Sequence, residues 1–256
     1  MNSSAKSAFS CIVFLTIVCA FWEFSVRIGW MNPRILPAFS TVIATLGPMI
    51  VDPYFLKHCG DTLLRVAIAY VIGVPIAVLM GLAIANSKRF GRHLEPVVHF
   101  ILGVPQSIFL PVLIMSFGTG DLGKVIFGIT HILFILSVYT IAAVHSVPQK
   151  YVLAARSFGA PQHMVFFSIY VPAMLPFLVT GLRTSMVFNV LGILLAEMYA
   201  SRTGLGLLIF HWGETHDVEN LMSGIIVISV VMITMNELLR IWEHRSGRWN
   251  PAFEKQ

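Results

Sequence analysis

Residues 147–172 read VPQKYVLAARSFGAPQHMVFFSIYVP and lie between two long apolar runs. Proline is tolerated in the first turn of a helix, and glycine commonly ends one in a left-handed conformation. Pro148 and Gly159 therefore predict a helix over 147–158. Ser146 and Gln149 have the spacing of a capping box, which would satisfy free backbone amides at the start of this helix.

The second half of the segment predicts another short helix. Pro161 can start it, and Pro172 would end it before the next apolar run. Ala154 and Ala155 are small, so another surface could approach the first helix closely. The local features favour a docking site for another protein and a helical connecting loop about equally.

The rest of the chain has the composition of a polytopic membrane protein. Of its 256 residues, 57% are hydrophobic and 11% are charged, and the mean hydropathy is +0.82. Soluble domains carry about 25% charged residues. An apolar helix of about 20 residues crosses a bilayer. Runs of about this length predict six spans, at residues 8–26, 62–85, 96–117, 122–145, 173–200 and 221–242.

The positions of the basic residues predict the orientation of these spans. With both termini in the cytoplasm, more of the Lys and Arg residues fall on inner segments than on outer ones, most sharply in the short loop 86–92. The net charge of +5 is therefore explained by membrane orientation. The sequence has no stripe of basic and aromatic residues, so we expect no nucleic-acid partner. The 147–172 segment then faces the cytoplasm.

The segment resembles the EAA motif of type I ABC importer permeases. In that motif Glu-Ala-Ala is followed by three residues, Gly, nine residues, Ile, one residue and Leu-Pro. Here Leu153 precedes Ala154 and Ala155, and the remaining positions are Gly159, Ile169, Val171 and Pro172. The spacing matches throughout, while Leu153 replaces the Glu and Val171 replaces the Leu.

Further blocks resemble the nitrate/sulfonate/taurine branch of these permeases, and together they cover nearly all of the chain. They are FWEF, NPRILPAFSTV, VPQSIFLPVLIMSFGTG, VPAMLPFLVTGLR, LLAEMYASRTGLGLLI and HRSGRW. The resemblance implies an all-α membrane protein with the type I importer permease fold. It also implies a first span and outer loop at 1–60, a transport domain at 61–242 and a cytoplasmic tail at 243–256.

The resemblance also implies the function and the partners. The chain would be a non-enzymatic transport subunit in the bacterial inner membrane, and its coupling helix would dock into a cytoplasmic ATPase dimer. The other partners implied are an external solute-binding protein and a second copy of the chain. The residues implied in ATPase coupling are Ala154, Ala155, Gly159, Ile169 and Pro172. ATP and Mg²⁺ would belong to the partner, and we expect no cofactor on this chain.

One stretch resembles a phosphate loop. GTGDLGKV at 118–125 nearly spells G-x-x-x-x-G-K-[ST], but Val125 stands where a hydroxyl should hold magnesium. The motif also needs a preceding strand, whereas an apolar span precedes it here. We therefore expect no nucleotide binding and no catalytic residue at this position.

Polar residues near or within the spans are the remaining candidates. Arg183 lies inside the fifth span, where a charge is costly, and is either a pathway residue or, as we favour, a structural one. Glu197 and Glu23 lie near outer span ends, where either could cap a helix or form an ion pair. A role in the pathway, in contact with the substrate, is the less favoured alternative for both. HWGETHD at 211–217 could suggest a metal site, but a solvated outer loop is favoured and no metal is expected.

An ion-gradient-driven secondary transporter is the alternative to an ATP-driven permease. Such a carrier would need several ionisable groups along its pathway, and inverted repeats are common in that class. His131 alone lies mid-span and is expected to be a buried histidine bonded to a carbonyl. Glycines that favour close helix packing, as in a tight bundle, are Gly73, Gly81, Gly181 and Gly192.

Overall fold

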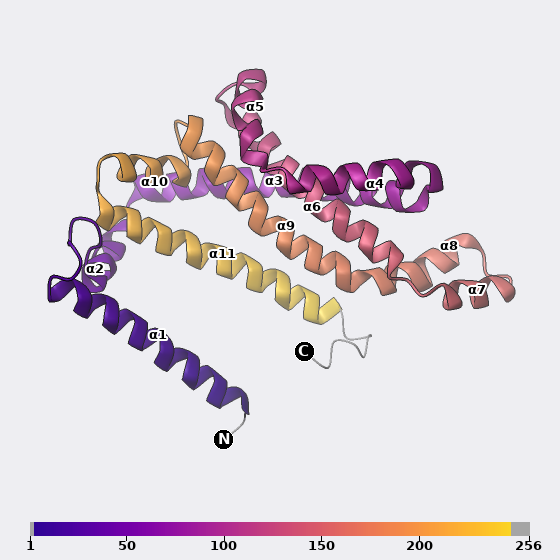
Figure 1. Ribbon diagram of the computed structural model, residues 1–256, viewed down its shortest axis with the longest axis horizontal. Coiled ribbons are helices and arrows are strands. Elements are labelled where there is room, and N and C mark those ends of the chain that lie inside the picture. Colours follow the sequence, from indigo (N-terminus) through magenta and orange to yellow (C-terminus); the bar gives the residue numbers. More distant parts are fainter. Residues whose placement is uncertain (1–2, 247–256) are drawn as a thin grey trace.

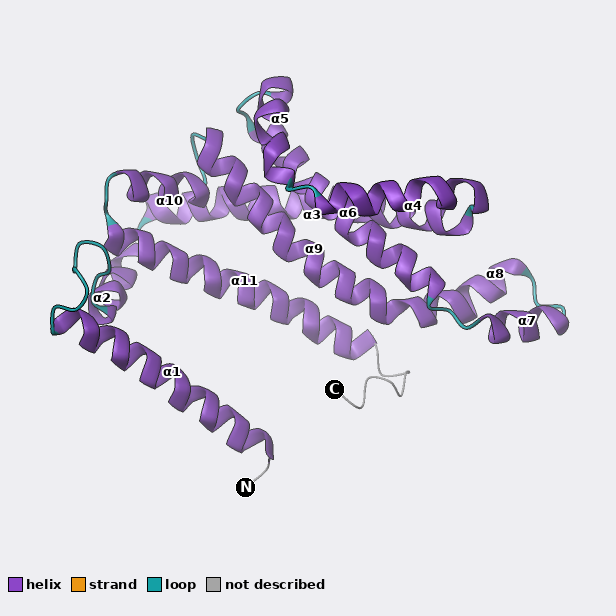
Figure 2. Cartoon of the chain, in the orientation of Figure 1, coloured by secondary structure: helices purple, strands orange, loops and turns teal. Residues whose placement is uncertain are grey.

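The computed structural model describes residues 3–246, and within that range all regular elements are helices (Figures 1 and 2). In chain order they are α1 (Ser3–Arg27), α2 (Phe39–Met49), α3 (Pro53–Asn86), α4 (Lys88–Gly103), the 3₁₀ helix η1 (Gln106–Phe109), α5 (Leu110–Phe117), α6 (Asp121–His145), α7 (Gln149–Ser157), α8 (Gln162–Val165), the π-helix η2 (Phe166–Tyr170), α9 (Val171–Ala200), α10 (Leu205–Glu214) and α11 (Val218–Ser246).

Helices α3, α6 and α9 form the centre of the protein. Their main apolar cluster consists of Val66, Ala69, Ala77, Val125, Ile132, Leu136, Val190 and Ile193. Helix α11 runs beside α9, and α1 lies apart at the edge, joined to the rest through α2 (Figure 1). Helix α10 lies at one end of the molecule, and α7 and α8 lie at the other (Figure 1). We call these the α10 end and the α7 end.

The close helix packing predicted from four glycines is confirmed. A β-carbon on Gly81 of α3 would lie 2.6 Å from Thr140 Cβ of α6, and one on Gly192 of α9 would lie 2.9 Å from His131 Nδ1. Gly73 and Gly181 similarly face α6 at 3.0 and 2.6 Å. Because a side chain at these points would overlap its neighbour, the glycines set the spacing of the three central helices.

The membrane spans are confirmed only in part. Four helical stretches among the described residues are long and apolar enough to cross a bilayer: α3, α6, Gln162–Ala200 and Val218–Arg240. A fifth is counted if the bent pair Gly91–Gly103 and Gln106–Phe117 forms one span. The predicted span at 8–26 falls within α1. Several side chains of this helix are not among those that the structure describes. Six spans and cytoplasmic termini remain predictions.

The stretch predicted as one span at 96–117 is not a single continuous helix. The chain bends by 87° between Gly103 and Gln106. Pro105 has no backbone N–H, and its ring disfavours a helical conformation for the preceding residue, Val104. Helix α4 therefore ends at Gly103, and η1 starts after Pro105 in a new direction.

The short loop predicted at 86–92 is also different in the structure. Helix α3 ends at Asn86 and α4 begins at Lys88, so only Ser87 separates them. The amide of Gly91 donates to the carbonyl of Ser87 at 2.7 Å. The basic residues Arg89 and Arg92 therefore lie on the first turns of a helix that runs back along α3.

The carboxylate of Glu23 joins the first outer loop to α1. Helix α2 begins at Phe39 after Ala38. The backbone N–H and hydroxyl of Ser40, in its first turn, donate to the Glu23 carboxylate at 2.9 and 2.8 Å. Arg27 also pairs with Glu23. Glu23 thus has the pairing role predicted for it and ties α1 to α2.

Candidate functional site

Helix α7 ends as the sequence predicts. Gly159 has a φ of +75°, a left-handed conformation that glycine adopts without strain. The amide of Ala160 donates to the Ala155 carbonyl at 3.0 Å, and that of Gly159 donates to the Arg156 carbonyl at 2.9 Å. These two bonds form a Schellman motif, which satisfies the last carbonyls of the helix and turns the chain toward α8.

The start of α7 and the role of Pro172 differ from the predictions. The Ser146 hydroxyl donates to the Ala143 carbonyl at 2.8 Å and forms no capping box with Gln149. Pro172 does not end α8. It is the second residue of α9, where its missing N–H needs no partner. The chain instead passes from α8 to α9 through the π-helix η2.

An apolar cluster fixes this segment to the end of the helical bundle. We call it the anchoring cluster, and its buried members are Ala143, Val144, Val147, Val152, Val165 and Met174. Val152 is the buried residue of α7, and Val165 is the buried residue of α8. The cluster therefore connects α7 and α8 to the end of α6 and the start of α9.

The opposite side of α7 presents large apolar groups to its surroundings. Phe158 is 91% exposed, and Tyr151 and Leu153 are also exposed. Together with Ala154, also exposed, these residues form what we call the α7 face. Large exposed apolar patches mark interaction sites. Phe158 was not selected from the sequence, although its position beside Gly159 could have identified it as a residue at the tip of the turn.

The five residues predicted for ATPase coupling divide into two groups. Ala154, Gly159 and Pro172 are exposed. Ala155 and Ile169 are half-buried and pack against the anchoring cluster. The structure therefore brings Ala154 and Gly159 to the surface of one short segment. Ala155 and Ile169 are placed to hold that segment on the bundle.

A buried polar cluster lies at the α10 end. Arg65 of α3 is 5% exposed and Glu197 of α9 is fully buried. Arg65 Nη1 donates to Glu197 Oε1 at 2.5 Å, and Arg65 Nε donates to Asp121 Oδ1 of α6 at 2.8 Å. The side chain of Arg65 thus joins α3, α6 and α9. Glu197 forms an ion pair, which is one of the roles predicted for it, whereas Arg65 was not selected as a candidate from the sequence.

The same cluster fixes the turn into α10. The Gly206 amide donates to Glu197 Oε2 at 2.9 Å, and the Leu205 amide donates to Thr62 Oγ1 at 2.8 Å. Thr62 Oγ1 also donates to Glu197. Gly204 has a φ of +119°, and a β-carbon there would overlap the Glu197 carboxylate. The cluster therefore holds four segments of the chain together at this end.

Two intramembrane polar residues have structural partners. Arg183 of α9 donates from Nε to Asn236 Oδ1 of α11 at 3.1 Å. His131 of α6 donates from Nδ1 to the Phe127 carbonyl at 3.0 Å, as predicted for a buried histidine. The Arg183 bond agrees with the structural alternative for that residue.

The stretch at 118–125 does not have the geometry of a phosphate loop, and the stretch at 211–217 does not have that of a metal site. Helix α5, instead of a strand, precedes 118–125, and the buried Lys124 lies 3.7 Å from the Asp121 carboxylate. In the 211–217 stretch, His211 is on α10 and His216 is in the following turn. Within residues 3–246 the structure shows no group of three or more His, Cys, Asp or Glu placed to hold a metal ion.

The fold and these two ends define a class of protein: a helical membrane protein with a closely packed central bundle and a short projecting helix pair at one end. The sequence pattern of the binding-protein-dependent transport system inner membrane components matches residues 73–248. The chain belongs to this family. It is an ABC transporter permease component and a multi-pass protein of the bacterial cytoplasmic membrane.

Several relatives match almost the whole chain. The putative aliphatic sulfonates transport permease protein SsuC of Bacillus subtilis is 24% identical, over 93% of this chain and 86% of the relative. The taurine transport system permease protein TauC of Escherichia coli is 26% identical, over 92% and 88%. The nitrate import permease protein NrtB of Synechococcus elongatus is 24% identical, over 93% and 89%.

A solved structure has the same fold. A chain of the MetNI methionine ABC transporter, in an inward-facing conformation, superimposes with a TM-score of 0.56 at 19% sequence identity. The match covers 83% of this chain and 97% of that chain. At this identity the likeness extends to the fold alone, which is that of a type I ABC importer permease.

Proposed function

We propose that this chain is the transmembrane subunit of an ATP-driven importer for a small solute of the nitrate, sulfonate and taurine class. A cytoplasmic ATPase dimer would supply the ATP and Mg²⁺ chemistry, and an external binding protein would deliver the solute. Two copies of the chain would form the path between them. Closure of the ATPases would then drive alternating access to that path.

The observation that carries this proposal is the α7 face. Phe158, Leu153 and Tyr151 are exposed on a short helix outside the bundle, and the EAA-like spacing places Ala154 and Gly159 on the same exposed segment. Docking of the α7 face would bury these side chains, and the anchoring cluster would pass the resulting force to α6 and α9. The proposal also places six spans in the membrane, with both termini in the cytoplasm.

The proposed domain arrangement follows the same orientation. Residues 1–60 would supply the first span and the outer loop, and residues 61–242 would form the transport domain. Residues 243–256 would form a cytoplasmic tail, of which residues 247–256 lie outside the described part of the chain.

The test is affinity purification of the tagged chain from its native membrane, followed by identification of the bound ABC ATPase. Leu153→Asp places a charge on the exposed α7 face without disturbing the anchoring cluster, so we expect the ATPase to be lost while the permease still inserts. The matched control is Leu122→Asp, which changes an exposed leucine on α6 at the α10 end. Normal recovery of the ATPase with Leu153→Asp would overturn the proposal.

A second measurement separates the proposal from the secondary-transporter alternative. Vesicles containing the chain alone, with a proton or sodium gradient, should show no solute uptake. Uptake should require the ATPase, the binding protein and ATP. Gradient-driven uptake by the lone chain would support the alternative.

A further inference from the structure

The break in the chain after α4 lies at mid-depth in the bundle. Before the break, Val98 of α4 is buried in one cluster with Ile141 of α6. After it, Leu110 of α5 is buried in one cluster with Phe127 of α6. Helix α6 is one of the apolar helices long enough to cross a bilayer, and these two contacts lie on either side of its middle. The break therefore falls near the middle of the membrane.

Polar groups at the break lack partners within the described part of the chain. The last carbonyls of a helix find no donor in their own helix, and Pro105 has no N–H to offer them. No backbone amide among the described residues donates to the carbonyls of Leu102 and Gly103. The side-chain oxygen of Gln106, where the next helix starts, is buried and has no hydrogen-bond partner in that same part of the chain. Because an unpaired polar group away from water is costly, these groups need partners from elsewhere.

Lipid cannot supply these partners. Acyl chains form no hydrogen bonds, so non-helical backbone at membrane depth is tolerated only against other protein or along a water-filled cavity. Gly103, Pro105 and Ser107 are exposed, and helix α5 projects from the bundle beyond them (Figure 1). The exposed side of the break therefore faces water or another protein chain.

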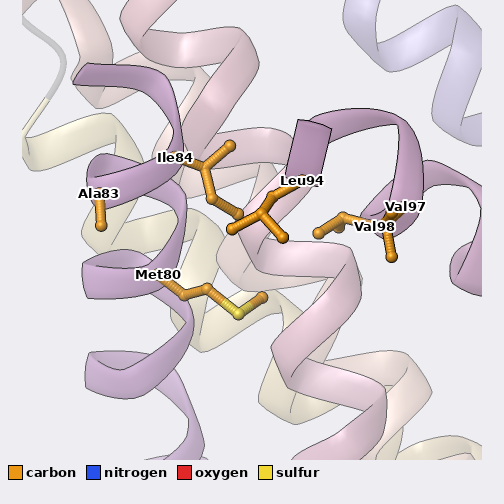
Figure 3. A pocket seen from close by; sticks show the side chains of 6 residues that line it. All are labelled: Met80, Ala83, Ile84, Leu94, Val97 and Val98. Carbon is orange, nitrogen blue, oxygen red and sulfur yellow. The ribbon is translucent and has the colours of Figure 1, made fainter. Parts of the chain in front are cut away.

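The preceding part of α4 has a surface that needs no polar partner. An apolar crevice of about 340 Å³ lies between α3 and α4, and its lining residues are Met80, Ala83, Ile84, Leu94, Val97 and Val98. Figure 3 shows Met80 and Ile84 projecting from α3 toward the side on which Val98 of α4 lies. Every lining side chain is apolar and the backbone on both sides is helical. The need for polar partners thus begins at the break.

We propose that the break lines a water-filled path for the solute, at the contact between two copies of the chain. The carbonyls of Leu102 and Gly103 would accept hydrogen bonds from water in the path. The hydroxyl of Ser107 would donate to an oxygen of a small hydrated anion, such as nitrate or a sulfonate. The inference rests on the proposed function, since a second copy must close the path on its other side.

The symmetry of such a pair favours a path that contains water over a dry contact. Near a two-fold axis, the surface of one copy meets the same surface of the other. Carbonyl acceptors would then face carbonyl acceptors, and a dry contact would leave both sets unpaired. Interrupted helices near the bilayer midplane form the solute sites of other transporters for the same reason, because irregular backbone there is stable only beside a cavity or protein.

The test measures the water accessibility of the break in the full chain, in its native membrane and with its three cysteines replaced. Ser107→Cys should be modified by 2-sulfonatoethyl methanethiosulfonate, a small anionic reagent that stays in water, when it is present on both sides of the membrane. The control is Val71→Cys, 71% exposed on α3 and two residues from Gly73, which faces Ile132 near the middle of α6. A thiol in apolar surroundings forms little of the reactive thiolate, so Ser107→Cys should react about tenfold faster or more.

Gly103→Cys is a second reporter of the break. A β-carbon at Gly103 meets nothing within 4 Å, so this variant should fold and react as fast as Ser107→Cys. Reaction of both thiols as slow as that of Val71→Cys would overturn the inference. Preferential reaction with the lipid-soluble N-(1-pyrenyl)maleimide would also overturn it, because that result places the break against lipid.

Recovery of the ABC ATPase from the same membranes separates this inference from the proposed function. Slow labelling of the break with the ATPase recovered would refute the water-filled path and leave the proposed function intact. Rapid labelling without the ATPase would support a break lined by water and count against the proposed function.

Discussion

Arg65 and Glu197 form a buried ion pair, with 2.5 Å between Nη1 and Oε1, although 131 residues lie between them in the sequence. The pair joins α3 to α9 at the end of the molecule opposite α7. Asp121 adds α6 to the same contact through Arg65 Nε. The three central helices are therefore fixed together at the α10 end, while the projecting helices α7 and α8 connect the ends of α6 and α9 at the other.

Removal of the cation from this pair should destabilise the protein strongly. Arg65→Met leaves the Glu197 carboxylate buried without its charged partner, which costs about 3–5 kcal/mol. The melting temperature of the purified permease should fall accordingly. Arg202→Met, which changes an exposed arginine at the same end, should have little effect. An Arg65→Met protein as stable as the unmodified chain would show that the pair contributes nothing.

Gly128 is expected to be intolerant of even one extra carbon. A β-carbon there would lie 2.5 Å from Asn189 Oδ1 and 2.8 Å from Ile193 Cδ1, both on α9. Overpacking of this kind costs about 1–3 kcal/mol, so Gly128→Ala should lower the unfolding free energy. Gly60→Ala, in α3 with nothing within 4 Å, should instead stabilise the helix by about 0.5–1 kcal/mol. Equal melting temperatures for the two variants would contradict this account of the packing.

Gly159 should be sensitive to backbone conformation and insensitive to crowding. A β-carbon there meets nothing within 4 Å, but φ is +75°. Gly159→Ala should therefore destabilise the end of α7 by about 1–2 kcal/mol. Gly159→Asn should cost less, because asparagine visits this conformation more readily. Protease cleavage within 150–160 should be faster for the alanine variant, and equal rates for both would argue against a conformational role.

The bond between Arg183 and Asn236 should appear as an energetic coupling. Arg183→Met and Asn236→Leu each remove one partner, so either change should lower stability. The double variant should be less destabilised than the sum of the two, by about 0.5–3 kcal/mol. Strictly additive effects in thermal unfolding would show that the contact has no structural importance and would reopen a pathway role for Arg183.

Features with a local cause could be predicted from the sequence, whereas contacts between distant segments could not. Gly159 and Gly81 were predictable, because a left-handed helix end and a close helix crossing each favour glycine for local reasons. The bend at Pro105 also has a visible local signal, but the apolar run on both sides of it favoured a continuous span. The partnership of Arg65 with Glu197 has no local signal, since it depends on how α3 and α9 lie in space.

Only part of the α7 face could be predicted from the sequence. The EAA-like spacing identified Ala154 and Gly159, but it gave equal weight to Ala155 and Ile169, which pack against the anchoring cluster. Helical periodicity alone does not tell which side of a short helix meets the bundle. The exposure of Phe158 is a property of the packed structure, set by the Schellman turn at Gly159 and the burial of Val152.

The most direct test of the account asks which side of the membrane Phe158 faces and what it touches there. Phe158→Cys, in a chain whose three cysteines have been replaced, should react with a membrane-impermeant maleimide only from the cytoplasmic side. A short bifunctional reagent should then cross-link it to the ABC ATPase, whereas Tyr199→Cys, an exposed aromatic position near the α10 end, should react only from outside and form no such product. Labelling of Phe158→Cys from the outer side, or no cross-link to an ATPase in the assembled transporter, would contradict the central claim.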